Sequence, residues 1–463
     1  MPDAVPKLAS GRLETLPLRG SGPAHDWAAS LLADLGVRVA RLPGPLSAPA
    51  EIEWAGSGAM ALTGRADGAP LPAPGPLASC ARGAALALEA LSDWQGDPLD
   101  GAALLGERAA LLGFARRGRI APGGACRLLR ARDGWIALQL ARPDDVAALP
   151  AWLECELAPG EPGAEPWGAV EAALRGRALA DLVARARLLG LPAAASAPLP
   201  SPPPPWLRVA LRAGAAAPRP PSARPRVVDL SSLWAGPLAG SLLQRAGATL
   251  WKVESLRRPD GARAGSAPFF DLLNAGKRSA ALDFEAVQGR RALRALLSRA
   301  DIVLESARPR ALQQLGIDAA AWLRAAPGRS WVSITGYGRR EPEAGWVAFG
   351  DDAGVAAGLA SATGGADAPL FCGDAIADPL AGLHAAVAAC ASWRAGGGHL
   401  LDLSLCDVAA AAATARVAAP AADPALVAAA PVAAAPRARR PSGRAAASGA
   451  DTAALLAEAG AAC

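Results

Sequence analysis

The pattern of apolar and polar positions changes in character near residue 226. From there on, short apolar or β-branched runs alternate with stretches of helical periodicity such as GPLAGSLLQRAG and VQGRRALRALLSRA. The apolar runs are RVVDLSSL, ATLWKVE, SAALDF, ADIVLES and RSWVSITGYG. Such alternation predicts a parallel sheet with right-handed helical crossovers. Residues 226–463 are therefore predicted to form a large α/β domain with a C-terminal tail.

Residues 121–200 have a different pattern. CRLLRARDGWIALQLA indicates two strands around Asp133-Gly134, a dipeptide that favours a tight type I′ turn. ARPDDVAALPAWL and VEAALRGRALADLVARARLLG then have helical periodicity. This pattern predicts a small α+β domain. It is followed at 201–225 by a Pro-rich linker that we expect to be stiff and extended rather than folded.

The first 120 residues repeat parts of the large α/β region. LLADLGVRVARL from Leu31 matches LLQRAGATLWKV from Leu242, an offset of 211 residues. SGAMALTGRADGAPL from Ser57 matches AGLASATGGADAPL from Ala357, an offset of 300. Chance similarity of Ala-rich sequence is the alternative, but the order and the glycine placements argue against it. Residues 1–120 are therefore predicted to be a truncated, degenerate repeat that lacks about 90 residues.

Composition excludes several classes of function. The net charge is +5 with scattered basic residues and 4% aromatics, so we expect no nucleic-acid partner. The seven cysteines form no CxxC pair and only three histidines are present, so no metal site is expected. Dispersed cysteines favour reduced thiols in the cytoplasm. The N-terminus lacks the apolar run of a signal peptide, and the Ala-rich runs are too short to span a membrane.

Nine segments carry a resemblance to a known family. In order they are AGPLAGSLLQRAGATLWKVE, PDGAR, FFDLLNAGKRSAALDF, ADIVLESARP, LGID, VSITGYG, GLASATG, ADPLAGLHAAVAA and WRAGGGHLLDLSL. This succession resembles the large domain of family III CoA transferases, the CaiB/BaiF type that includes formyl-CoA transferase, carnitine CoA-transferase and alpha-methylacyl-CoA racemase. The resemblance implies a Rossmann-like large domain over roughly 226–415. It also implies that 14–200 is a shortened large-domain piece followed by the family's small domain.

The same resemblance implies a set of CoA-binding residues. Coenzyme A would be a substrate here, and no permanently bound cofactor is expected. Its 3′-phosphate and pyrophosphate favour paired cations, although lysines and arginines at loop exits are often only solvated. The residues implied are Lys277 and Arg308 for the CoA phosphates and channel, Leu233, Trp234 and Ala235 for the adenine and ribose, and Arg257 or Arg258 as further phosphate partners.

The resemblance also implies covalent catalysis by an aspartate, which would form a mixed anhydride and then an aspartyl-CoA thioester. The resemblance implies that this aspartate follows an aromatic residue, at a fixed distance before the GLxxxTG glycine. Counting back from Gly358 leads to Gly350, with Asp351 and Asp352 directly after it. A local slip would aim Asp351 into the site. Alternatively, both carboxylates cap a helix that starts near Ala353.

Two further aspartates and two alternative activities also have to be considered. Asp378 is placed to act as an N-cap and Asp402 to organise a strand end, so both are predicted to be structural. A racemase would need a histidine upstream of its aspartate, and none lies between His25 and His384. A CoA-binding pseudoenzyme without turnover stays open, because Gly350 replaces the expected acid.

The order of the segments suggests how a site could be assembled. In this family the active site usually forms between a large domain and the small domain of a partner chain. A tandem fusion would place both parts in one polypeptide, as a pseudo-dimeric monomer, although a homodimer stays open. The expected small-molecule partners are an acyl-CoA and a carboxylic acid, whose identities the sequence does not specify.

Overall fold

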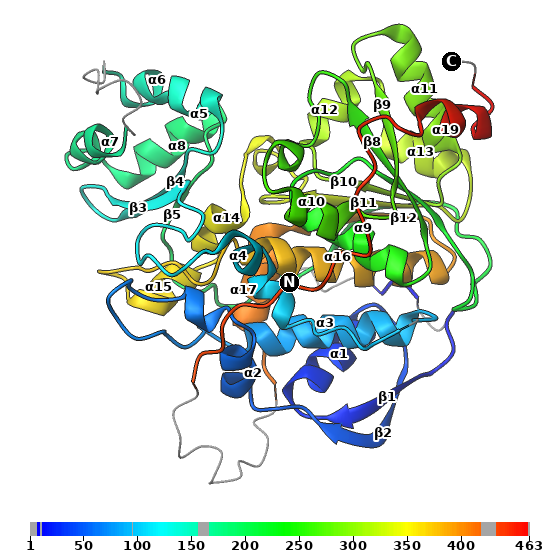
Figure 1. The fold of residues 1–463 in the computed structure, drawn as a ribbon, viewed down its shortest axis with the longest axis horizontal. Coiled ribbons are helices and arrows are strands. Elements are labelled where there is room, and N and C mark those ends of the chain that lie inside the picture. The colour runs from blue at the N-terminus through cyan, green and yellow to red at the C-terminus, as the bar shows by residue number, and fades with distance from the viewer. Residues whose placement is uncertain (1–6, 10–11, 95, 156–165, 418–431, 462–463) are drawn as a thin grey trace.

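The computed structural model describes residues 7–9, 12–94, 96–155, 166–417 and 432–461. A seven-stranded sheet forms the upper right lobe in Figure 1, in the order β6-β12-β11-β10-β7-β8-β9. All neighbours are parallel except the antiparallel pair of β12 and β6. The strands are β6 (Arg208–Arg212), β7 (Arg226–Asp229), β8 (Thr249–Ser255), β9 (Arg278–Leu282), β10 (Ile302–Glu305), β11 (Ser330–Thr335) and β12 (His399–Ser404).

Each apolar run that predicted a strand after residue 226 forms one, which confirms the mixed α/β class with a mainly parallel sheet. These strands read as near-continuous apolar runs because the sheet is covered on both faces. The helices of this part are α9 (Ala235–Arg245), α10 (Ala267–Asn274), α11 (Val287–Ser298), α12 (Pro309–Gln314), α13 (Ala319–Ala325), α14 (Gly350–Ala356), α15 (Leu359–Gly364), α16 (Ala377–Arg394), α17 (Leu405–Ala413) and α19 (Thr452–Glu458), with short 3₁₀ turns η3 (Gly261–Ala264) and η4 (Glu343–Gly345).

Helix α16 lies at the centre of the molecule. Almost all of its residues are buried, because α9, α3, α17 and strands β11 and β12 contact it. Small residues allow this close packing: a Cβ on Gly382 would lie 2.7 Å from the carbonyl oxygen of Ala235. Helix α16 therefore fixes its own N-terminus against the beginning of α9.

The Pro-rich segment 201–225 differs from its prediction. Residues 208–212 form β6, an antiparallel edge strand on β12, so part of the expected linker belongs to the main sheet. Arg212 pairs with His399 in register, and Arg208 forms an ion pair with Asp407. The prolines flank this strand rather than interrupt it, and proline is tolerated beside an edge strand.

A second, three-stranded sheet and four helices form the upper left lobe in Figure 1. The elements are β3 (Cys126–Arg130), β4 (Trp135–Gln139), α5 (Pro143–Ala147), α6 (Leu149–Leu153), α7 (Trp167–Leu174), α8 (Leu179–Leu189) and β5 (Ala193–Ala195). The predicted hairpin is present, but the type I′ turn is wrong. The Ala131 N–H donates to the Gly134 carbonyl oxygen at the end of the hairpin, but neither Asp133 nor Gly134 has the positive φ that a type I′ turn requires. Asp133 also accepts a hydrogen bond from the backbone N–H of Leu179 on α8.

Most of the described residues between 12 and 112 form the base of the molecule, at the bottom of Figure 1. Strands β1 (Leu16–Ser21) and β2 (Val39–Leu46) pair in parallel on either side of α1 (Pro23–Asp34) in the chain. Helix α3 packs against both α1 and α16, so one continuous core joins the base to the upper right lobe. The remaining elements are α2 (Ala50–Gly56), η1 (Met60–Leu62), α3 (Leu77–Leu91), η2 (Ala103–Gly106) and α4 (Glu107–Leu112).

Three further observations concern the predictions from composition. None of the helices in the described ranges is both long and apolar enough to cross a membrane. Across the same ranges, no cluster of three or more His, Cys, Asp or Glu side chains could hold a metal ion. Six cysteines lie in the described part of the chain, all as free thiols. Cys463 and the first six residues, on which part of the signal-peptide prediction rests, lie outside it.

Candidate functional site

The strand order of the large sheet reverses at the carboxyl ends of β7 and β10, the edge at which open α/β sheets form a ligand-binding crevice. The chain proceeds from β7 outward to β8 and β9 and then returns to the other side of β7 to form β10. In open α/β sheets, ligands bind at the carboxyl ends of strands where the order reverses in this way. The carboxyl ends of β7 and β10 are joined here, since the backbone N–H of Ser232 donates to Ser306 Oγ at 3.0 Å. This edge is therefore the expected location of a ligand-binding site.

The predicted adenine-binding segment lies at this edge. Leu233 is 40% exposed and has a positive φ of 70°, which is strained for a leucine. Its backbone N–H donates to Asp260 Oδ1 at 2.9 Å, and this bond holds the unusual conformation. Trp234 is buried against Phe269 with ring centroids 5.4 Å apart, and Ala235 begins helix α9. The segment therefore presents one exposed apolar side chain and a rigid backbone to the crevice.

Two buried ion pairs support the segment Leu233–Ala235. Lys277 Nζ lies 2.8 Å from Asp229 Oδ2 and 2.9 Å from the Pro237 carbonyl oxygen. Lys252 Nζ lies 2.8 Å from Asp260 Oδ2. Burial alone would raise the pKa of Asp229, but the Lys277 and Lys252 ammonium groups outweigh it and hold that pKa below its ordinary value. The ammonium of Lys277 is thus occupied inside the protein, which favours a positioning role; its contact with CoA phosphates stays a prediction.

The three predicted arginines lie on the surface, in two places. Arg257 and Arg258 are exposed after β8, where Arg257 lies 3.1 Å from Glu285. Arg308 is exposed at the N-cap of α12, directly after β10. Its Nη1 lies 3.9 Å from where a Cβ on Gly190 would be, so Arg308 reaches the end of α8 in the other lobe. Arg308 and Leu233–Ala235 therefore share the crevice, whereas Arg257 and Arg258 lie one strand farther out.

The predicted nucleophiles Asp351 and Asp352 lie in the first turn of α14, and both are buried. Asp352 is 0% exposed, and its Oδ1 accepts a hydrogen bond from the backbone N–H of Phe349 at 2.7 Å. It closes the first turn of the helix, as the capping interpretation expected. Asp351 Oδ1 accepts from the backbone N–H of Ala375 at 2.8 Å. Neither carboxylate faces open solvent.

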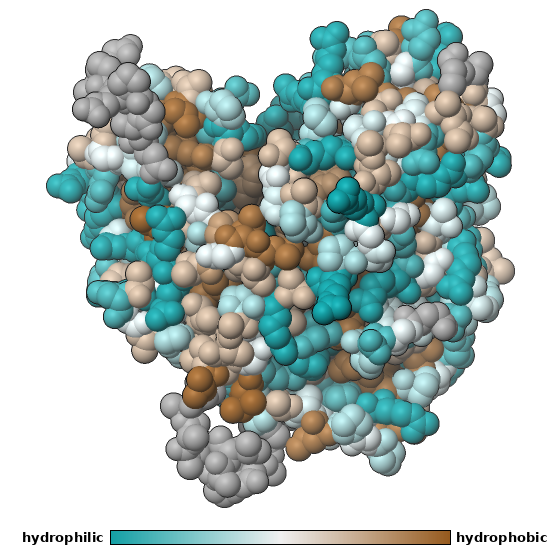
Figure 2. Space-filling model, viewed as in Figure 1, coloured by the Kyte–Doolittle hydropathy of each residue, from teal (hydrophilic) through white to brown (hydrophobic). Residues whose placement is uncertain are grey.

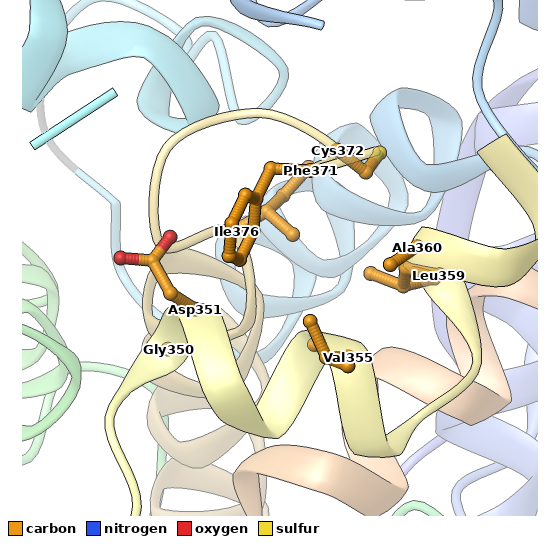
Figure 3. Close-up of a pocket in the computed structure, with 9 residues that line it drawn as sticks. Gly350, Asp351, Val355, Leu359, Ala360, Phe371, Cys372 and Ile376 are labelled. Atoms are coloured by element: carbon orange, nitrogen blue, oxygen red, sulfur yellow. The ribbon is translucent and has the colours of Figure 1, made fainter. Parts of the chain in front are cut away.

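Asp351 borders a small apolar cavity, shown in Figure 3. Its carboxylate points away from the apolar side chains of Val355, Leu359 and Phe371 that line the space. The cavity volume is about 10 Å³, room for roughly one water molecule. Burial and the charge of Asp374 raise the pKa of Asp351 to about 7. As arranged here, Asp351 has no adjoining space for a thioester.

A different aspartate, Asp378, is more exposed than Asp351 and Asp352. Asp378 is the second residue of α16, whose N-cap is Ile376, so the predicted N-cap role of Asp378 is wrong. Its Oδ2 accepts from the backbone N–H of Gly350 at 3.1 Å, and the backbone N–H of Ala235 also interacts with it. Asp378 is partly exposed, in contrast to Asp351, Asp352 and Asp374. Burial raises its pKa to about 6.

Gly350 makes this position of Asp378 possible. A Cβ on Gly350 would lie 2.3 Å from Asp378 Oδ2 and 2.4 Å from the Ala375 carbonyl oxygen. Any side chain at 350 would therefore displace the Asp378 carboxylate. The sequence held one signal for this arrangement: Asp378 stands four residues before Gly382, the glycine at which α16 meets Ala235.

Residues from the N-terminal 120 also reach the site. Arg108 donates to both carboxylate oxygens of Asp374, at 2.8 and 2.5 Å. Its guanidinium lies over the ring of Trp234, 5.1 Å from the centroid. The positive charge of Arg108 also lowers the pKa values of Asp351 and Asp378 against the effect of burial. Arg108 therefore links the base of the molecule to both the crevice and the carboxylates.

The upper left lobe contacts the same region. Trp135 and neighbouring side chains of β3 and β4 pack with Val355, Ala360 and Phe371 in one apolar cluster. Strands β4 and β5 both contact α14. The segment 126–195 therefore lies against the helix that carries Asp351, which is what a single-chain site requires.

The Asp351→Asn variant is expected to be more stable than the wild-type protein at pH 8 by about 2–4 kcal/mol. The folded-state pKa of about 7 lies above the unfolded value, so ionisation costs stability as pH rises from about 4 to 7. Asparagine keeps an oxygen for the Ala375 N–H. Denaturant unfolding at pH 4 and pH 8 checks this. An equal effect at both pH values would mean that Asp351 is ionised without cost.

Comparisons with known proteins relate the large α/β part of the chain to one family. Residues 224–445 match the model of CoA-transferase family III. The chain is 31% identical over 208 residues to a succinate–glutarate CoA-transferase of Agrobacterium fabrum, covering 41% of this chain and 52% of that protein. It is 29% identical over 192 residues to a succinyl-CoA–D-citramalate CoA-transferase of Chloroflexus aurantiacus, covering 39% and 48%.

A solved structure of a CaiB/BaiF family protein from Brucella suis is 29% identical, with a TM-score of 0.35 over 41% of this chain and 54% of that chain. The chain spans about half the length of the curated relatives that it matches. Over residues 224–445, the chain is similar to CoA-transferase family III.

Proposed function

We propose that this chain binds an acyl-CoA in the crevice between β7 and β10 and transfers its CoA to a carboxylic acid, with Asp378 as the reacting carboxylate. One observation carries the proposal: Asp378 is a partly exposed carboxylate held by the backbone N–H groups of Gly350 and Ala235. Ala235 belongs to the segment expected to border CoA. The relatives named above act on succinate, glutarate and D-citramalate, so a short acid is the natural substrate class to test.

The chemistry follows from the position of Asp378. Its carboxylate attacks the thioester carbonyl, the C–S bond breaks, and CoA leaves as a thiolate with a mixed anhydride remaining on Asp378. The thiolate attacks the aspartyl carbonyl and releases the first acid. The acceptor carboxylate then attacks the aspartyl-CoA thioester, and the thiolate returns to form the new acyl-CoA and free Asp378. The N–H groups of Gly350 and Ala235, near the N-terminus of α16, would stabilise the negative charge on each aspartyl tetrahedral intermediate.

For CoA itself, we propose Leu233–Ala235 beside the adenine and ribose, and Arg308 beside the phosphates. Arg308 is exposed at the crevice and free to form the bidentate contacts that phosphates favour. Arg257 and Arg258 would contact the outer phosphate. Lys277 would act indirectly, because its pair with Asp229 supports the loop that holds Leu233.

The proposed architecture is a single-chain version of a two-chain site. The order β1-α1-β2 parallels β7-α9-β8, and α3 packs on α1 as α16 packs on α9. These likenesses support a truncated repeat at 1–120, a small domain at 121–200 and an intact large domain at 226–463. The small domain would then complete the site of its own chain, as a pseudo-dimeric monomer.

The alternative is a CoA-binding protein without turnover, which the closed cavity at Asp351 favours if Asp378 does not react. Racemisation has less support. His384 is 0% exposed, accepts a hydrogen bond from Trp27 at its Nε2, and has its Nδ1 2.7 Å from the Leu380 carbonyl oxygen. A histidine with both nitrogens occupied in the core is unsuited to moving a substrate proton.

Trapping the intermediate tests the proposal. The protein is incubated with succinyl-CoA or glutaryl-CoA and hydroxylamine, and its peptides are analysed by mass spectrometry. A hydroxamate is expected at Asp378 in the wild-type protein and in Asp351→Asn, but not in Asp378→Asn. Label at Asp351 would reassign the nucleophile. CoA binding without label or exchange would support the binding protein instead.

A further inference from the structure

A second cluster of polar side chains lies where the two upper lobes meet, apart from Asp378. Arg187 on α8 places its guanidinium carbon 3.5 Å from the ring centroid of Trp346 and 5.9 Å from that of Tyr337. The two rings contact each other edge to face, 5.5 Å apart. Among the described residues, no carboxylate forms an ion pair with Arg187. A guanidinium that lies over an indole ring and has no carboxylate partner can bind an anion.

Three buried polar atoms in this cluster have no hydrogen-bond partner within the described structure: Arg187 Nε, Tyr337 Oη and Asp352 Oδ2. A buried polar atom left unpaired costs about 1–3 kcal/mol. Several in one place are better explained by a missing ligand than by three separate defects. Asp352 supplies the strongest example, since its side chain is 0% exposed and only its Oδ1 is used, by the Phe349 N–H.

The electrostatics indicate which kind of ligand would fit. Burial raises the pKa of Tyr337 well above its ordinary value; Asp352 raises it further, while Arg187 lowers it. Tyr337 is therefore within reach of both charges. Burial also raises the pKa of Asp352 well above its ordinary value. Arg187 offers a positive charge and several N–H donors, and Tyr337 offers a hydroxyl group, so the complementary ligand is an acceptor with negative charge.

The position of the cluster suits a substrate. Arg187 comes from α8 of the left lobe, Tyr337 and Trp346 from the segment after β11, and Asp352 from α14. Figure 2 shows that the surface is hollowed between the two upper lobes. At the end of α8, Arg142 donates to the Gly190 carbonyl oxygen and Arg308 lies beside the same glycine. Arg142 forms an ion pair with Asp145. Arg187, in contrast, forms no ion pair with a carboxylate among the described residues.

We propose that Arg187, which lies over the Trp346 ring beside Tyr337, binds a second carboxylate on the substrate, so that the chain selects dicarboxylic acids over monocarboxylic acids of equal length. The proposal rests on the proposed function and names its substrate class. The planar guanidinium group can donate to both oxygens of a carboxylate at once. Its contact with the Trp346 ring restricts the orientations that it can take.

Binding measurements with matched thioesters test the proposal without requiring turnover. Glutaryl-CoA and valeryl-CoA have the same five-carbon acyl length, but only glutaryl-CoA carries a second carboxylate. Isothermal titration calorimetry of the full chain is expected to give at least about tenfold tighter binding of glutaryl-CoA, in line with a charge-assisted bidentate pair. Arg187→Met should remove that preference and leave valeryl-CoA affinity unchanged. Arg187→Lys should retain only part of it.

Arg185→Met is the matched control. Arg185 lies on the same helix but contacts the Ala151 carbonyl oxygen and Glu154, so its loss should leave the preference intact. Equal binding of the two thioesters by the wild-type protein, or a preference that survives Arg187→Met, would overturn the carboxylate site while leaving CoA binding in place. Failure of both thioesters to bind would instead overturn the proposed function, and the carboxylate site with it.

Discussion

Asp378→Asn is expected to lower CoA transfer by at least about 1,000-fold while changing CoA affinity little. Removal of a covalent nucleophile typically costs a factor of this size or more, because the two-step route is lost entirely. Asparagine keeps an oxygen that can accept from the Gly350 N–H, so the local structure should persist. Initial rates of CoA exchange, with succinyl-CoA or glutaryl-CoA as donor and short acids as acceptors, measure the loss. Titration with CoA measures the affinity.

Asp351→Asn is the matched control for this loss. Asp351 lies in the first turn of α14 and is buried, so its substitution should not remove the reacting group. Wild-type circular dichroism spectra and cooperative unfolding transitions would show that both variants fold. Wild-type turnover in Asp378→Asn, or a 1,000-fold loss in Asp351→Asn alone, would contradict the assignment of Asp378.

The sheet was predictable because its strands are buried on both faces and therefore read as continuous apolar runs. Strand β6 was not predicted because RVALR has only three apolar residues between two arginines and lies between Pro-rich stretches. Nothing local distinguishes such a segment from an extended linker; the unpaired edge of β12 decides its structure. Similarly, Asp133 in the loop of the β3–β4 hairpin accepts a hydrogen bond from Leu179, which lies 46 residues away.

The site was predictable only where one local segment defines it. Leu233–Ala235 and Arg308 follow β7 and β10, so the strand order alone brings them together. Lys277 could not be interpreted fully from its motif, because its partner Asp229 lies 48 residues away and buries the ammonium. Asp378 was missed for a similar reason. Its closeness to Gly350 and Ala235 follows from the packing of α16 on α9 and α14. Counting residues from Gly358 along the sequence does not predict that packing.

Arg108→Met is expected to destabilise the protein by about 3–5 kcal/mol at neutral pH, since it leaves the 0% exposed carboxylate of Asp374 without its counter-charge. Denaturant unfolding of both proteins at neutral pH gives the difference. In Arg108→Met/Asp374→Asn the buried charge is gone, and most of the stability should return.

The pH dependence of the CoA-exchange rate tests separately whether Arg108 affects the reacting carboxylate. Because Arg108 holds down the pKa of Asp378, Arg108→Met should shift the acid limb of the exchange-rate profile to higher pH. Arg108→Lys keeps the charge but not the bidentate contact, so it should lose stability with little shift of that limb. An unshifted limb in Arg108→Met, together with a large stability loss, would mean that Arg108 supports only the fold and that the N-terminal 120 residues do not tune the reacting carboxylate.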